Sequence, residues 1–159
     1  MQLLKFFTIL FIFSWLILTG NNAFAVKSCT INSPNIAFGT SFNPTNNTAL
    51  QTTFSNVITV TCSGMPPNGS YTITFAAGTH GTIAARSMQS STPHTLNFNV
   101  YTSNAYTTPL GTAAGATITS SCITSCSNTH TVYGQIPADT TAFADVNQYT
   151  DAILMTLTY

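Results

Sequence analysis

Residues 149–159 alternate between apolar and polar side chains. Threonines occupy most positions of one parity, interrupted by Leu154. The apolar positions of the other parity are Ile153, Met155, Leu157 and Tyr159. A period of two with β-branched and aromatic residues is typical of a half-buried β-strand. An apolar strand with no polar tail leaves an unpaired edge that is prone to association, unless another strand pairs with it. We therefore expect another chain to complete this subunit.

The first 25 residues have the features of a secretory signal peptide. Lys5 is followed by an apolar run from Phe6 to Leu18 and by the sequence Ala23-Phe24-Ala25. The apolar run is shorter than the roughly 20 residues that a membrane span needs. We expect cleavage after Ala25, which leaves one domain over residues 26–159 and no membrane span. An uncleaved membrane anchor is the alternative.

The predicted mature chain holds very little charge. Its charged side chains are Lys27, Arg86, Asp139, Asp145 and Asp151. Nucleic-acid binding and attachment to an anionic membrane surface both need clusters of basic side chains, so we exclude both. Low net charge favours association. The composition therefore suits an extracellular protein that packs into an assembly.

Four cysteines in an exported chain predict disulfides rather than free thiols. Of the three possible pairings we favour Cys29–Cys62, which would tie the opening strand to the next one, together with Cys122–Cys126, which would close a tight loop. The alternative is a metal site built on Cys122-x3-Cys126-x3-His130. That site lacks a fourth ligand at a recognisable spacing.

Short alternating runs, separated by turn residues, fill most of the chain, and no amphipathic helix exceeds two turns. This spacing predicts an all-β sandwich. Residues 102–129 are rich in Thr, Ser, Ala and Gly, and we expect an irregular excursion there with a short hairpin. The predicted extended segments are residues 29–42, 56–62, 71–75, 96–100, 132–136 and 149–159.

Catalytic chemistry finds little support in the sequence. The histidines show no two-His metal spacing, and there is no Gly-x-Ser-x-Gly motif. We expect Asp151 to cap a turn rather than act as a general base. For Arg86 we expect a solvated side chain, and the alternative is pairing with a carboxylate or a C-terminal group. The other titratable candidates are Asp139, Asp145, His80, His94 and His130. We predict no enzyme activity, no cofactor and no metal.

Several motifs together resemble the spore coat protein U domain, a family that includes the subunits of archaic chaperone–usher pili. The matching motifs are Phe38-Gly39 after Cys29, Cys62 at the end of an alternating strand, Arg86-Ser87-Met88, residues 132–138 (VYGQIPA) and Tyr149-Thr150-Asp151. The resemblance covers residues 29–159. The family usually has Gly two residues before the Tyr of the last strand, where this chain has Asn147. The Cys122-to-Cys126 loop is not expected in most members.

The resemblance implies an immunoglobulin-like β-sandwich that lacks its final strand. It also implies a secreted structural subunit of a pilus or cell-surface coat, of the kind that serves adhesion and biofilms. A periplasmic chaperone and an outer-membrane usher would handle the subunit, and a strand from a neighbouring subunit would complete it at the cell surface. The runner-up is a self-contained spore-coat or matrix protein that needs no chaperone.

The expected partner-strand groove lies between the opening strand and the last strand. Its predicted residues are Ile31, Ile36, Phe38, Ile153, Met155, Leu157 and Tyr159. The alternative is that these are ordinary core residues of a complete sandwich. After cleavage only residues 26–28 would precede Cys29, and at about 3.3 Å per residue they are too short to form a donor strand. We therefore expect a subunit that accepts a strand without donating one, at a fibre tip or terminus.

Overall fold

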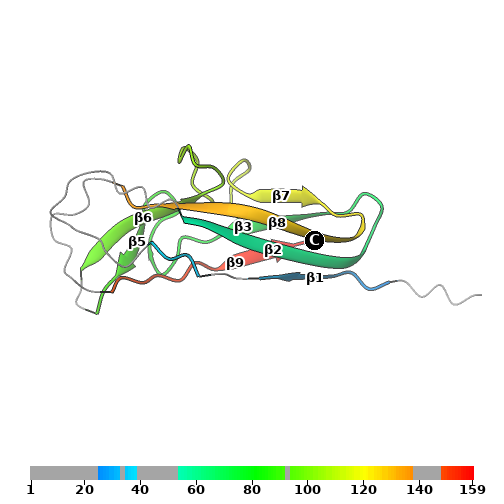
Figure 1. The fold of residues 1–159 in the computed structure, drawn as a ribbon, viewed down its shortest axis with the longest axis horizontal. Helices are drawn as coiled ribbons and strands as arrows, with labels where there is room; N and C mark the ends of the chain where they lie inside the picture. Colours follow the sequence, from blue (N-terminus) through cyan, green and yellow to red (C-terminus); the bar gives the residue numbers. More distant parts are fainter. Residues whose placement is uncertain (1–24, 33–34, 39–53, 92–93, 138–147) are drawn as a thin grey trace, which may run out of the picture.

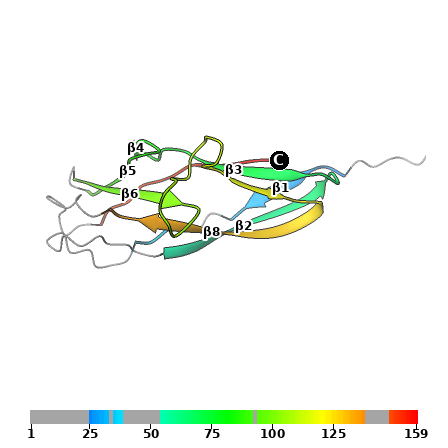
Figure 2. The ribbon, with the colours of Figure 1, turned by 90° about the horizontal axis from the view of Figure 1, so that it is seen from above.

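The computed structural model describes residues 25–32, 35–38, 54–91, 94–137 and 148–159. These residues form strands and turns without a helix, which confirms the predicted all-β sandwich. A six-stranded sheet with the order β1-β2-β8-β6-β5-β4 packs against a three-stranded sheet with the order β7-β3-β9 (Figures 1 and 2). The strands are β1 (Ser28–Ile31), β2 (Phe54–Met65), β3 (Ser70–Phe75), β4 (His80–Gly81), β5 (Arg86–Gln89), β6 (Thr95–Tyr101), β7 (Ile118–Ser121), β8 (Thr124–Gln135) and β9 (Met155–Thr158).

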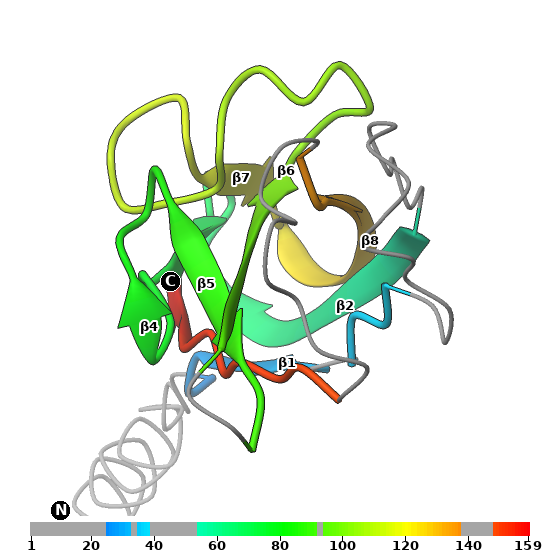
Figure 3. The same cartoon turned by 90° about the vertical axis from the view of Figure 1, so that its left-hand side faces the viewer.

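Alternating side chains hold the two sheets together. Along β3, Tyr71, Ile73 and Phe75 are buried, while the threonines between them are partly exposed. The large sheet contributes apolar side chains of the same alternating kind from β2, β6 and β8, including Ile58, Val60, Leu96, Phe98, Val100 and Val132. Burial of each such side chain contributes about 1.5–3 kcal/mol. Seen end-on, the strands surround this common core (Figure 3).

Strands β2 and β8 pair along most of their lengths, from Phe54↔Gly134 to Cys62↔Cys126 and beyond. β7 and the start of β8 both lie within residues 102–129, so the prediction of an irregular excursion there was wrong for these two parts. The inward positions in the first half of β8 are Cys126, Asn128 and His130, which are half-buried. Because none of these is aliphatic, the apolar alternation that marks a strand is absent there.

Residues 148–159 cross from one sheet to the other. Thr150 exchanges two main-chain hydrogen bonds of 3.0 Å with Gln89 of β5. Further along, β9 pairs with β3, with Leu157 opposite Ile73. The predicted strand over residues 149–159 is therefore two short pairings. The alternation continues through both pairings, because the odd-numbered side chains from Tyr149 to Leu157 face the core in each of them.

Other strand predictions fall partly outside the described residues. β1 occupies the start of the predicted segment 29–42, whereas residues 39–42 lie outside the described part, as do Asp139, Asp145 and Asn147. Neither β4 nor β5 was predicted as a strand. Both strands are too short to show a period.

Candidate functional site

β1 and β9 are edge strands of different sheets, and they lie next to each other. Among the described residues β1 pairs only with β2, and β9 pairs only with β3. Cα atoms of the two strands approach within 8 Å, and they run side by side in Figures 1 and 3. We call this boundary, formed by residues 29–32, 35–38 and 153–159, the β1–β9 seam. An edge strand presents unpaired main-chain N–H and C=O groups.

Most of the apolar residues predicted for the groove lie at the margin of the core. Six of them pack against the core but are only partly buried: Ile31, Ile36, Phe38, Ile153, Met155 and Leu157. Leu154, of the other parity, is 71 % exposed, which shows that the alternation has a distinct outer face. Tyr159 is 42 % exposed and does not belong to the packed set. The seam is therefore a strip of apolar side chains that are only half-buried.

The Phe38 side chain, on one side of the seam, lies over Gly134 of β8. A Cβ atom at Gly134 would come within 2.6 Å of Phe38 Cε1 and 3.5 Å of Ile36 Cγ2. Phe38 also makes an edge-on contact with Phe98, with ring centroids 5.5 Å apart. Gly134 thus provides the room in which one side of the seam packs, which gives a physical reason for a glycine within residues 132–138.

One interaction links the two sides of the seam directly. Lys27 Nζ donates a hydrogen bond of 3.2 Å to the main-chain oxygen of Tyr159 and lies 5.9 Å from the centroid of the Tyr159 ring. Lys27 is the single charged side chain that is exposed in the described part of the chain. Sequence reasoning did not find this pair, because no pattern relates residues 132 positions apart.

Arg86 is completely buried, so the prediction of a solvated side chain was wrong. Its guanidinium donates to the main-chain oxygens of Ala76 (2.6 and 3.1 Å) and Leu110 (2.7 Å) and to Asn99 Oδ1 (2.5 Å). Burial lowers the pKa of Arg86, and Asp151 opposes that shift. The five fixed donors of a guanidinium can serve several carbonyls at once. Arg86 therefore supports the fold by satisfying main-chain acceptors from separate segments.

Asp151 caps the turn that follows β3, as the sequence analysis expected. Its Oδ1 accepts a hydrogen bond of 2.9 Å from the main-chain N–H of Thr79 and lies 3.6 Å from His80 Nδ1. Gly78 adopts φ +95°, and a Cβ atom there would collide with the Asp151 carboxylate. Both the positive φ and this close approach require a glycine at position 78.

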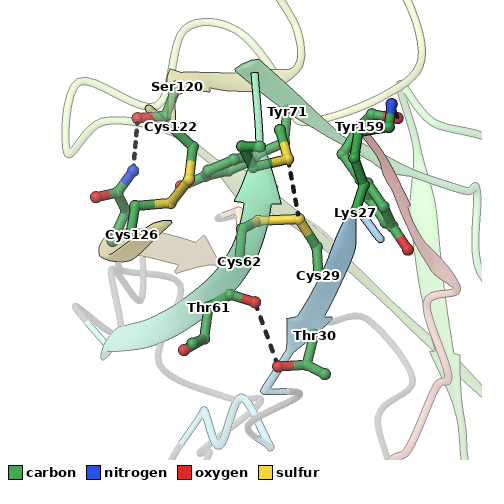
Figure 4. The surroundings of a disulfide bond; sticks show 12 residues. Lys27, Cys29, Thr30, Thr61, Cys62, Tyr71, Ser120, Cys122, Cys126 and Tyr159 are labelled. Atoms are coloured by element: carbon green, nitrogen blue, oxygen red, sulfur yellow. Dashed lines mark hydrogen bonds between the residues drawn. A yellow bond between two sulfur atoms is a disulfide. The ribbon is translucent and has the colours of Figure 1, made fainter. Parts of the chain in front are cut away.

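Both favoured disulfides form. Cys29–Cys62 joins β1 to β2, and Cys122–Cys126 closes the turn between β7 and β8 (Figure 4). The alternative metal site does not hold, because its two thiols are bonded to each other. The third residue of that alternative, His130, shares a hydrogen bond of 2.6 Å with the Tyr71 hydroxyl instead. This bond connects β8 to β3 across the core.

The described residues thus form a β-sandwich with a buried Arg86 and with a disulfide between opposed cysteines of β1 and β2. The family model of the Spore Coat Protein U domain matches residues 17–156. The chain belongs to this family. No match was found among curated proteins. Membership of the Spore Coat Protein U family indicates a structural surface protein of the pilus or coat type.

Among the residues that the structure describes, no helix has the length and apolar character that a membrane crossing requires. The predicted signal peptide lies almost entirely outside the described residues, so its cleavage after Ala25 stays a prediction.

Proposed function

We propose that the β1–β9 seam accepts a strand from another protein, and that this Spore Coat Protein U chain is a secreted subunit assembled by donor-strand complementation. A periplasmic chaperone would supply the first strand, and a neighbouring subunit would replace it after passage through the usher. The observation that carries this proposal is the row of half-buried apolar side chains along two edges that do not pair with each other.

Strand addition supplies the physical basis. A guest strand hydrogen-bonds to the free edge of a sheet, and its alternate side chains fill pockets between the host residues. If about four inward residues each contribute roughly 1.5–3 kcal/mol, the guest adds on the order of 6–12 kcal/mol. That rivals the whole stability of a typical domain, about 5–15 kcal/mol. The unpartnered subunit should therefore be marginally stable.

The subunit would sit at a fibre tip or another terminal position. Cys29 is bonded to Cys62, which holds the chain in β1 from that residue onward. Cleavage after Ala25 would leave only residues 26 and 27 ahead of β1, and Lys27 contacts Tyr159. Two residues are too few for a donor strand, because strands most often have about 5–6 residues.

The seam also supports the runner-up function in one respect. β1 and β9 already approach within 8 Å, and the Lys27–Tyr159 interaction joins them in the isolated chain. A self-contained coat or matrix protein would have this arrangement as its final state. The two functions differ in whether an added strand is taken up.

Co-expression with the chaperone of a chaperone–usher system tests the proposal. We expect a stable periplasmic complex with the native chain, and its loss in Leu157→Asp, which places a charge in the half-buried row. Leu154→Asp is the matched control, since Leu154 is exposed on the same segment. Equal complex formation by both variants, or no complex with the native chain, would contradict the proposal.

A further inference from the structure

The two disulfide bonds lie next to each other, so that the four cysteine sulfurs form one cluster. Cys29, Cys62 and Cys126 occupy directly opposed positions on the neighbouring strands β1, β2 and β8. The sulfur atoms of Cys62, Cys122 and Cys126 all lie within 4.8 Å of one another. Figure 4 shows the two disulfides next to each other. Cys62 therefore has a second possible partner besides Cys29.

The pairing geometry of β2 suits a bond between Cys62 and Cys126. The Cα atoms of Cys29 and Cys62 are 4.1 Å apart, the short spacing of a pair without main-chain hydrogen bonds. Because the N–H and C=O of one strand residue point to the same side, Cys62 must direct both groups toward β8. A hydrogen-bonded pair has its Cα atoms about 5.5 Å apart. Disulfides span about 4.4–6.8 Å, so this spacing fits.

We propose that Cys62 and Cys126 are a thiol–disulfide exchange pair that interconverts the two disulfides of this chain. The external reactant is a thiol, either a small molecule or a thiol–disulfide oxidoreductase. Its thiolate attacks Cys29 Sγ, which forms a mixed disulfide at Cys29 and releases Cys62 as a thiolate. A second external thiolate then frees Cys29 as a thiol. These two steps reduce the Cys29–Cys62 disulfide and oxidise the reagent to its own disulfide.

The internal step consumes no oxidant or reductant. The Cys62 thiolate attacks Cys126 Sγ, the Cys62–Cys126 bond forms, and the Cys122–Cys126 bond breaks. Cys122 leaves as a thiolate and takes up a proton from solvent. This step moves a disulfide from the loop to β2, and its reverse restores the loop bond. When Cys29 is a thiolate, its attack on Cys62 Sγ forms Cys29–Cys62 and releases Cys126 as a thiolate. Since Cys122 and Cys126 are only 4 residues apart, their bond closes a short loop, and exchange offers a route from that local bond to Cys29–Cys62.

Two double variants of the full chain test the geometry. Cys29→Ser/Cys122→Ser leaves Cys62 and Cys126, which face each other. Cys62→Ser/Cys122→Ser leaves Cys29 and Cys126, which β2 separates by about two strand spacings of 4.8 Å. With oxidised glutathione as the oxidant, we expect the first variant to close its disulfide at least about tenfold faster than the second, because its two thiols are held together. Peptide mass spectrometry after alkylation identifies the bonds.

The native chain supplies a second test that needs no substitution. After partial reduction of the folded protein with dithiothreitol and rapid alkylation, we expect peptides joined through Cys62 and Cys126, with Cys29 and Cys122 alkylated. Absence of that linkage in the native chain, or equal closure by the two double variants, would overturn the proposal. Both tests are independent of strand addition at the seam.

Discussion

Lys27 and Tyr159 connect the two edges of the β1–β9 seam: the Lys27 ammonium donates to the Tyr159 carbonyl at 3.2 Å and lies 5.9 Å from the centre of its ring. The carbonyl belongs to the residue just after β9, and Lys27 precedes β1 directly. An entering strand would have to separate these two residues or pass beside them. The interaction is a link between the two strands at one end of the seam.

Removing the link should ease strand entry with little effect on stability. In Lys27→Met the free energy of unfolding should change by less than about 1 kcal/mol, because exposed charged pairs contribute little. Uptake of a fluorescently labelled donor-strand peptide should become faster than in the native chain. Slower uptake at unchanged stability would mean that Lys27 guides the strand instead of holding the seam closed.

Arg86 should be among the most sensitive positions of the fold. Arg86→Met leaves the carbonyls of Ala76 and Leu110 and the Asn99 side chain without their donor. Each buried acceptor left without its donor typically costs about 1–3 kcal/mol. Urea unfolding should show a loss of that size, whereas the neighbouring Ser87→Ala should stay within about 0.5 kcal/mol, as surface changes usually do. A loss of similar size in both variants would show that Arg86 has no special role.

Gly134 and Phe38 should be coupled. Gly134→Ala places a methyl group within 2.6 Å of the Phe38 ring, so the ring must move, at a typical cost of about 1–3 kcal/mol. In a Phe38→Ala background the same substitution should cost much less, because the obstructing ring is gone. A double-mutant cycle by urea unfolding measures this difference. Additive losses would mean that Gly134 serves the backbone of β8 rather than the seam.

Acid should weaken the sandwich through His130. Burial lowers the pKa of His130 from its usual value near 6.5. The unfolded chain therefore binds a proton before the folded chain does, and stability falls as pH drops through about 6.5 toward the lower folded pKa. Below the folded pKa this contribution levels off. His130→Gln should reduce the slope of unfolding free energy against pH just below about 6.5, as measured by urea unfolding at a series of pH values.

The sequence indicated most of the sandwich because alternation is explicit where inward positions are aliphatic, as in β3 and β6. It failed where the inward side chains are polar or sulfur-containing, as at Asn128 in β8, and where strands are too short to show a period, as in β5. The apolar residues of the seam were visible in the pattern. The burial of Arg86 and the Lys27–Tyr159 link were not, because both depend on contacts between segments distant in sequence.

The central claim is that the β1–β9 seam is completed by a strand from another chain. Thermal unfolding of the processed chain, alone and with the donor strand of a candidate partner subunit fused after Tyr159, tests it most directly. We predict a large rise in Tm together with loss of aggregation, since the added strand would bury the half-exposed apolar row. A chain that is already stable and monomeric, with a Tm unchanged by the added strand, would contradict the claim and identify a self-contained coat protein.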